Sequence, residues 1–189
     1  ALFLSSFFAI TCSNDQMLRT KANELAQKFI ITDGHIDTPW KLSKNYEDIS
    51  LRTKTGDFDY VRAKKGGLDV PFMAIYIPSS YIETGGAKEK ADSLIDMVEQ
   101  IANKDPDKFE IAYSLEDANR IFKEGKIALP MGMENGAGIE NDINNLKHFY
   151  DRGIRYITLT HSQDTLICDS SSDEEEDTWG GLSPYGKKV

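Results

Sequence analysis

Two potential metal ligands stand two residues apart in the stretch TDGHIDTPW, at His35 and Asp37. The apolar run 29–31 just before them is typical of a buried strand. Because side chains at i and i+2 of a strand point to the same face, His35 and Asp37 would aim an imidazole and a carboxylate at one place. Zinc accepts both kinds of ligand, so the pair could begin a metal site. A strand that ends in a polar turn is the alternative, and the pair alone does not decide.

Two further strand patterns end in residues that could do chemistry, Glu134 and His161. Gly132 and Gly136 flank Glu134, and we expect them to leave room for an ion or a ligand near the backbone. His161 follows the β-favouring run YITLT, which should anchor its ring. In a parallel βα barrel the strands' carboxyl ends lie on one face, where the active site is built. Each residue alone could be a capping or surface residue, but three such strand ends together predict a site.

Helical and strand patterns alternate along the chain, which predicts parallel βα units of an α/β fold. Beside the strand that carries His35, we expect strands at 66–78, 109–114, 126–136 and 154–161. Helices are expected at 14–30, 88–103, 115–125 and 139–153. In the last of these helices Ile139, Ile143, Leu146 and Phe149 should face inward. Ser114 and Asp117 form a capping box, and residues 41–66 are expected to be a long loop over one end of the fold.

The composition indicates a globular protein and disfavours nucleic acid as a partner. Forty per cent of the residues are hydrophobic and the formal net charge is -9, whereas phosphate binding needs clustered Lys and Arg. Two cysteines, Cys12 and Cys168, are too few for a disulfide framework, and we do not expect them to pair. The acidic run SSSDEEED at 170–177 is expected to be a solvated loop, with a calcium site as the alternative.

The first residues differ from the rest of the chain. Residues 2–10 are apolar but too short for a bilayer, which needs about 20 residues, and they suit the apolar region of an export signal. The following AITC resembles the lipobox of bacterial lipoproteins, although Ala9 and Thr11 depart from its usual residues. We therefore expect 1–12 to be an export signal shortened at its start, with Cys12 lipidated and the protein tethered outside the cytoplasm. A buried N-terminal strand or helix is the alternative.

Five motifs, in order and at about the right separations, resemble the membrane (renal) dipeptidase family, zinc peptidases of the amidohydrolase superfamily. They are DGHIDTPW, GGLDVPFMAIYIP, GKIALPMGMENG, DRGIRYITLTHSQDT and GLSPYGKKV, and the resemblance covers nearly everything after residue 28. It implies a TIM-like (β/α)8 barrel that hydrolyses the peptide bond of dipeptides with a zinc-bound hydroxide. It also implies that His35 and Asp37 bind one zinc, that Glu134 bridges two zincs, and that His161 binds and polarises the substrate.

A complete barrel needs eight strands and typically about 250 residues. This sequence offers four strong strand patterns and the short FEIAYS, so we expect 13–189 to be the N-terminal half of the barrel. The resemblance puts two more zinc-binding histidines and the catalytic aspartate beyond Val189, so no catalytic residue is assigned within the sequence. We expect this half alone to be inactive, because half a barrel leaves sheet edges open. His148 should face solvent from a helix and is not expected to replace a ligand.

Two other functions stay open beside a dipeptidase, and a homodimer is one of the open oligomeric states. A non-catalytic lipoprotein could use the same barrel to bind peptides or solutes, which the loss of Asp37 or Glu134 would indicate; both are present. Another amidohydrolase, such as a deaminase or a phosphotriesterase-like enzyme, would usually begin with His-x-His on the first strand. Asp37 at the second position therefore favours the dipeptidase.

Overall fold

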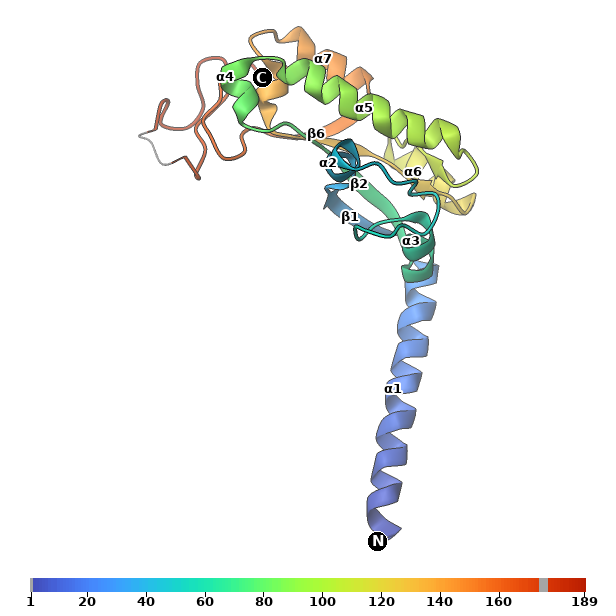
Figure 1. The fold of residues 1–189 in the computed structure, drawn as a ribbon. Coiled ribbons are helices and arrows are strands. Elements are labelled where there is room, and N and C mark those ends of the chain that lie inside the picture. The colour runs from blue at the N-terminus through green and yellow to red at the C-terminus, as the bar shows by residue number, and fades with distance from the viewer. Residues whose placement is uncertain (1, 174–176) are drawn as a thin grey trace.

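A four-stranded parallel sheet organises the chain, which the computed structural model describes at residues 2–173 and 177–189, with side chains from residue 14 onward. The sheet order is β1-β2-β5-β6, and every neighbouring pair is parallel. A smaller parallel sheet pairs β3 with β4. The strand bounds are β1 (Ile31–Ile36), β2 (Leu68–Tyr76), β3 (Phe109–Glu110), β4 (Ile127–Ala128), β5 (Met131–Glu134) and β6 (Ile154–Thr158). The parallel βα organisation expected from the sequence is confirmed (Figure 1).

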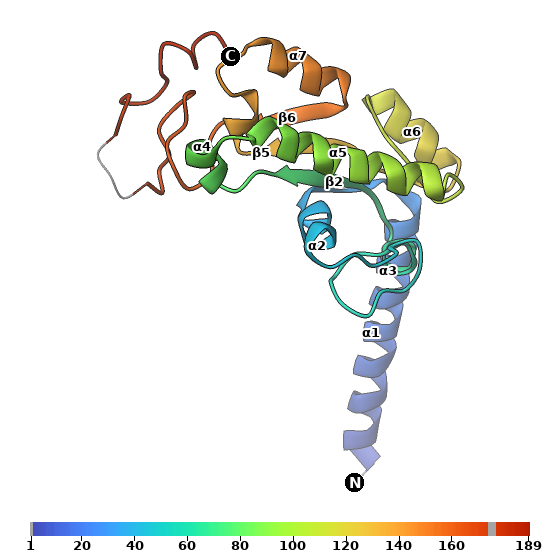
Figure 2. The same ribbon diagram turned by 45° about the horizontal axis from the view of Figure 1, so that its top comes forward.

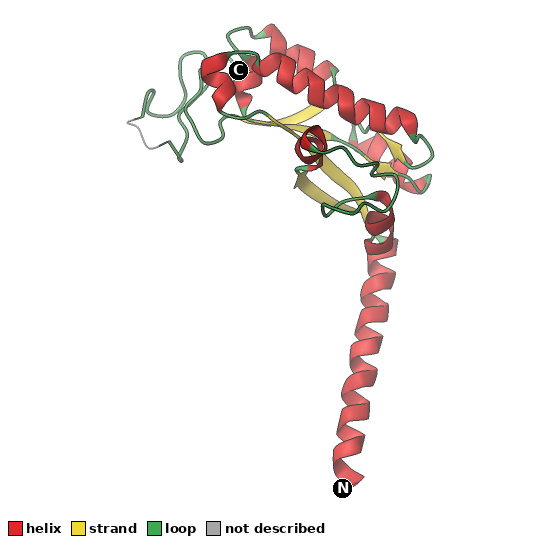
Figure 3. Ribbon diagram, in the orientation of Figure 1, coloured by secondary structure: helices red, strands yellow, loops and turns green. Residues whose placement is uncertain are grey.

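Helices connect the strands, and α5 and α7 lie on the same side of the large sheet (Figure 2). The helix bounds are α1 (Leu2–Lys28), α2 (Thr38–Lys44), α3 (Tyr60–Gly66), α4 (Ser80–Thr84), α5 (Ala87–Lys104), α6 (Leu115–Lys123) and α7 (Asn144–Asp151), with a 3-10 turn η1 (Gly136–Ile139). Ser114 caps α6 by accepting a hydrogen bond from the Asp117 N–H, as the capping box predicts. After β6 the described chain forms loops (Figure 3).

The hydrophobic core lies between the large sheet and α5. Strand alternation turns one set of side chains toward the helices, and these are fully buried: Met73, Ile75, Met131 and Met133. They meet the apolar stripe of α5, in which Ala91, Leu94, Ile95 and Val98 are also fully buried. Each large side chain buried in this way contributes about 1.5–3 kcal/mol to folding. This core holds the strands rigidly, so the other face of the sheet is free to carry polar residues.

The single strand expected at 126–136 is two strands with different partners. The Ile127 and Leu129 N–H groups donate hydrogen bonds to carbonyl groups at and beside β3. The Pro130 carbonyl, in contrast, accepts a hydrogen bond from the Met73 N–H of β2. Proline has no N–H to donate, so the ladder breaks at this point and the chain passes to the other sheet. The expected long loop at 41–66 is also wrong in part, because the last residues of α2 and the whole of α3 lie within it.

The region expected to be a single helix at 139–153 is the turn η1 followed by the shorter helix α7. Ile139 and Phe149 are buried as expected, but Ile143 lies before the helix and is 42% exposed. His148 does not point freely into solvent: its Nε2 lies 2.7 Å from the Asp92 carboxylate of α5. Arg152 bonds to the same carboxylate at 3.1 Å, so α7 is tied to α5 by charged groups that are far apart in the sequence.

The expected helix at 14–30 is present as the end of α1, but it does not pack on the sheet. Figures 1 and 3 show α1 projecting away from the rest of the chain, and Leu18 and Leu25 are exposed. Its contact with α3 includes a hydrogen bond from the Gln27 side chain to the Lys64 carbonyl. No helix within the described residues combines the length and the apolar character that crossing a bilayer requires. The Cys12 side chain lies outside the described part.

The described part of the acidic run lies in a loop, where the Ser170 N–H donates a hydrogen bond to the Asp164 carboxylate. Asp169, just before the run, accepts hydrogen bonds from the backbone N–H groups of Trp179 and Gly181. Residues 174–176 lie outside the described residues, so the solvated loop and the calcium site stay predictions. Cys168 is buried with a free thiol, and burial raises its pKa.

The buried turn after β5 provides a test of the fold. Asn135 has a φ of 82°, its side chain donates to the Ile77 carbonyl and accepts from the Ala137 N–H, and it is fully buried. Asn135→Ala leaves those two groups without partners, so we expect urea unfolding to report a loss of about 1–3 kcal/mol. Asn135→Gly should lower the free energy of unfolding less than Asn135→Ala does, because glycine tolerates positive φ. The exposed Asn141→Ala is the control, and a loss no greater than in this control would contradict the account.

Candidate metal centre

Three candidate ligands from two parts of the chain meet at the carboxyl ends of β1 and β5. His35 lies on β1, Asp37 is the N-cap residue of α2, and Glu134 ends β5. One ligand atom from each lies within 4.8 Å of the others. His35 Nε2 is 3.1 Å from Glu134 Oε2 and 3.4 Å from Asp37 Oδ1. The structure therefore brings together the three residues that the sequence analysis expected to meet.

Asp37 reaches this place by a different path from the one expected. β1 ends at Ile36, and its register with β2 is irregular between Asp33 and Ile36. Asp37 is therefore not a strand residue in line with His35 but the first residue of the turn into α2, where Pro39 follows. Its side chain caps no N–H of α2 and is 55% exposed, so both carboxylate oxygens are available to a ligand.

Glu134 stands between two imidazoles, one at each carboxylate oxygen. Oε2 faces His35, and Oε1 lies 3.3 Å from His161 Nε2. Only 17% of the Glu134 side chain is exposed, and β5 is hydrogen-bonded to β2 on one side and β6 on the other. A carboxylate held in the middle of the sheet with its oxygens turned to two sides can be shared between two cations.

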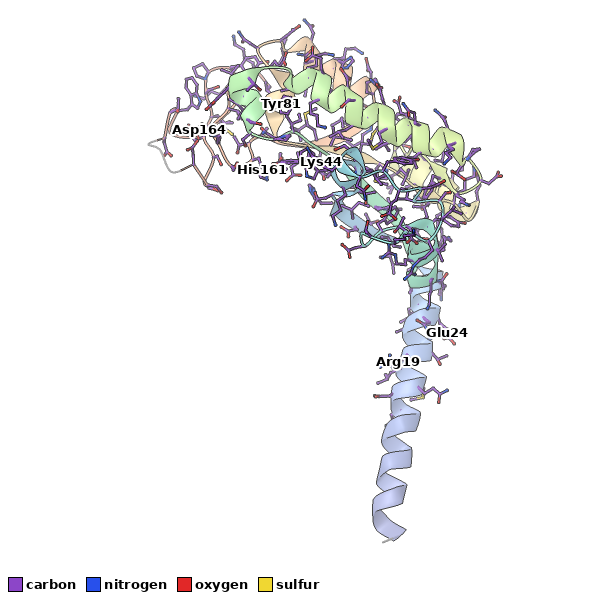
Figure 4. The ribbon with its side chains drawn as sticks, viewed as in Figure 1. Arg19, Glu24, Lys44, Tyr81, His161 and Asp164 are labelled. Carbon is purple, nitrogen blue, oxygen red and sulfur yellow. The ribbon has the colours of Figure 1, made fainter. Side chains whose placement is uncertain are left out.

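His161 is not on a strand, because β6 ends at Thr158 and the chain turns outward. Its ring lies against the Tyr76 ring at 5.0 Å between centroids, and its carbonyl accepts a hydrogen bond from Ser170 Oγ. Figure 4 labels His161 on the loop beyond β6, in the same region of the molecule as Lys44 of α2. The ring is thus anchored, as expected, but by an aromatic contact and a loop.

Tyr156 is a part of this site that the sequence analysis missed. Its hydroxyl donates to the Gly34 carbonyl at 3.0 Å and lies 3.0 Å from His35 Nδ1. Because the only hydroxyl proton goes to Gly34, we assign the proton of the second contact to Nδ1, which leaves Nε2 facing the two carboxylates. A hydrogen bond from a neighbouring residue to the other ring nitrogen orients histidine ligands in metal sites.

The glycines beside Glu134 serve the protein's own packing and not the approach of an ion. A Cβ at Gly132 would collide with the Tyr156 ring, and a Cβ at Gly136 would collide with Ile167 and the Leu159 carbonyl. The expectation that these glycines make room for a ligand is therefore wrong. Gly132 is the sequence signal that could have pointed to Tyr156, because a glycine within a strand often marks the place where another group approaches closely.

The carboxylates of the site carry negative charge that no Lys or Arg among the described residues neutralises. Within the described residues neither Asp37 nor Glu134 forms an ion pair with Lys or Arg. Burial, together with the charges of Glu134 and Asp37, raises the pKa of the Tyr76 and Tyr156 hydroxyls. One imidazole nitrogen and two carboxylates without a cationic partner form a donor set that fits a zinc-type divalent ion.

The comparisons with known proteins decide the family. The sequence pattern described as membrane dipeptidase, peptidase family M19, matches residues 19–189. The chain belongs to this family. It is 30% identical over 184 residues to an uncharacterised dipeptidase of Schizosaccharomyces pombe, covering 89% of this chain and 45% of the relative. It is 28% identical to dipeptidase 3 of Mus musculus, covering 93% of this chain and 36% of the relative. The chain therefore spans less than half the length of these relatives.

Solved structures agree with the expected fold. The crystal structure of the probable dipeptidase PvdM from Pseudomonas aeruginosa matches with a TM-score of 0.79 and 26% identity, over 92% of this chain and 46% of that chain. A metallopeptidase from Rhodobacter sphaeroides, liganded with a phosphinate mimic of L-Ala-D-Ala, matches with a TM-score of 0.70 and 21% identity, over 85% of this chain and 54% of that chain. At that identity the second match shows the fold alone. The four parallel strands and their helices thus correspond to part of a TIM-like barrel.

The contact between Tyr156 and His35 gives a test that does not need activity. We expect Tyr156→Phe to weaken zinc binding about 10–100-fold, because His35 loses the partner of Nδ1 while the ring still fills the space over Gly132. Calorimetric titration of the metal-free protein with zinc measures this, and Tyr150→Phe, at an exposed tyrosine, is the control. Equal affinity in the two variants would show that Tyr156 does not position His35.

Proposed function

We propose that the protein to which this chain belongs is a zinc-dependent dipeptidase. One observation carries the proposal: the ligand atoms of His35, Asp37 and Glu134 lie within 4.8 Å of one another at the carboxyl ends of the strands. Membership of the membrane dipeptidase family supports the same reaction class. Asp37 at the second ligand position favours a dipeptidase over amidohydrolases that use His-x-His there.

Each residue of the centre has a distinct role in this proposal. His35 and Asp37 would hold one zinc, and Glu134 would share its two oxygens between two zincs. When bound, the zincs supply a nucleophile from water near neutral pH and polarise the carbonyl of the peptide bond. Tyr156 keeps the Nδ1 proton of His35 and so directs Nε2 toward the carboxylates.

His161 acts on the substrate in this proposal. It approaches Glu134 from the side opposite His35, and Tyr76 supports its ring. From there an N–H of the imidazole can donate to the carbonyl oxygen of the peptide bond as negative charge develops on it. Losing one such donor typically costs on the order of 10²–10³ in rate.

Two variants of the full-length protein separate these roles. We expect Glu134→Gln to lower both the zinc content and the hydrolysis of dipeptides, because a neutral amide is a poor bridge between cations. His161→Ala should keep close to the wild-type zinc content and lose about 10²–10³ in kcat. Elemental analysis and steady-state kinetics on the same preparations measure both, with Glu116→Gln, at an exposed residue of α6, as the control.

Three outcomes would contradict the assignment. Activity that survives complete removal of metal would exclude a zinc-dependent reaction. Loss of zinc from His161→Ala would make that residue a ligand. A protein that binds zinc and dipeptides but hydrolyses none of them would be the non-catalytic binding protein of the alternative.

We also propose that the protein is exported and held at a membrane by a lipid on Cys12. The apolar run followed by AITCSND supports this proposal. The full-length Cys12→Ser protein should move from the membrane fraction to the soluble fraction, since one residue carries the lipid. Immunoblotting of the two fractions measures this, and the same distribution for both forms would refute the lipid anchor.

A further inference from the structure

Two lysines from different helices lie over one indole ring at the edge of the candidate metal centre. Lys44 Nζ of α2 is 4.2 Å from the centroid of the Trp40 ring, and Lys90 Nζ in the first turns of α5 is 5.3 Å from it. An aromatic face attracts a cation, but it carries no net charge to neutralise two of them. The three side chains form what we call the Trp40 cluster.

Neither ammonium of the Trp40 cluster has an acidic partner. Within the described residues no carboxylate forms an ion pair with Lys44 or Lys90, although the chain carries a formal net charge of -9. Three charged side chains near these residues already have partners: Lys41 pairs with Asp57 at 3.1 Å, and Glu47 accepts hydrogen bonds from Thr55 and the Lys54 N–H. The cluster is therefore an uncompensated positive site.

The two ammoniums also repel each other. Both lie close to the same ring, so their separation does not exceed the Debye length of about 10 Å at 0.1 M salt. Burial and then the charge of Lys44 lower the pKa of Lys90. A carboxylate that accepts a hydrogen bond from each ammonium would offset this repulsion, because it has two oxygens.

The Trp40 cluster lies within reach of the candidate metal centre. Trp40 and Lys44 line a cavity of about 550 Å³ that Asp37 also lines, a size suited to a small ligand. The Trp40 ring meets Tyr76 edge-on at 5.2 Å, and Tyr76 in turn contacts His161. Because one cavity is lined by both Asp37 and Lys44, a dipeptide of about 7 Å that binds there can present a carboxylate on the side of Lys44.

We propose that Lys44 and Lys90, whose ammoniums are held over the Trp40 ring, form a subsite that binds a carboxylate of the dipeptide substrate. The inference rests on the proposed dipeptidase function for the identity of the substrate, and it names a carboxylate as the group that this subsite binds. The carboxylate can belong to an acidic side chain or to the C-terminus, and the two sources give different kinetics.

The kinetic test compares Ala-Glu with Ala-Gln, which differ in the charge of one side chain. In the full-length protein we expect Lys44→Met with Lys90→Met to raise KM for Ala-Glu about tenfold. An unchanged KM for Ala-Gln identifies the side-chain carboxylate as the bound group. An equal rise for both dipeptides identifies the C-terminal carboxylate instead. Lys123→Met, at an exposed and unpaired lysine of α6, is the control, and a double variant that matches this control on both substrates overturns the proposal.

A binding measurement keeps this inference separate from the proposed activity. The difference in fluorescence between the full-length protein and its Trp40→Phe variant isolates the signal of Trp40 and so reports the cluster directly. Titration with glutarate should give a saturable change that salt weakens and that the double lysine variant loses. If the protein hydrolyses no dipeptide but shows this response, the proposed function fails and the subsite stands. If the protein is active, and neither the fluorescence nor KM depends on the lysines, the subsite is refuted.

Discussion

The Glu134 carboxylate, with an imidazole at each of its two oxygens, is the interaction on which the rest of the site depends. Its position is fixed by β5, one of the two inner strands of the sheet. β5 is hydrogen-bonded to β2 and β6 in a register that sets Glu134 beside Tyr76 and Thr158. A charge held there without a Lys or Arg partner is costly unless something positive approaches it. The core of methionine and isoleucine residues behind β5 keeps the carboxylate from moving away.

Two neighbouring constraints follow from the same strand. Gly132, two residues before Glu134, leaves the space that the Tyr156 ring fills, and this ring carries the hydroxyl that orients His35. Asn135, the residue after Glu134, closes the turn with a positive φ and two side-chain hydrogen bonds. The short segment 132–135 thus supplies one candidate ligand, room for the group that orients a second candidate, and the turn that holds them.

Local pattern predicted that the three candidate ligands would meet, but it did not predict the residues that support them. His35, Asp37 and Glu134 were found because polar residues at the ends of apolar strands are visible in sequence, and the parallel order makes those ends meet. Tyr156 was missed because a tyrosine in a strand looks like ordinary packing, and only the fold places it over a glycine 24 positions earlier. The contact between His148 and Asp92 joins residues 56 positions apart, which no local period encodes. Pro130 can be read from the sequence, but the break that it causes in the expected strand could not be predicted, because that break depends on the second sheet, formed by β3 and β4.

The measurement that tests the account most directly is the location of zinc in crystals of the full-length protein, by anomalous diffraction at the zinc edge. The account predicts a zinc bonded to His35 Nε2 at about 2.0–2.1 Å, with carboxylate oxygens of Asp37 and Glu134 at about 2.0–2.2 Å. It also predicts that the second Glu134 oxygen binds a second zinc, while His161 binds none. Zinc bound to His35 through Nδ1, or zinc found away from Glu134, would contradict it.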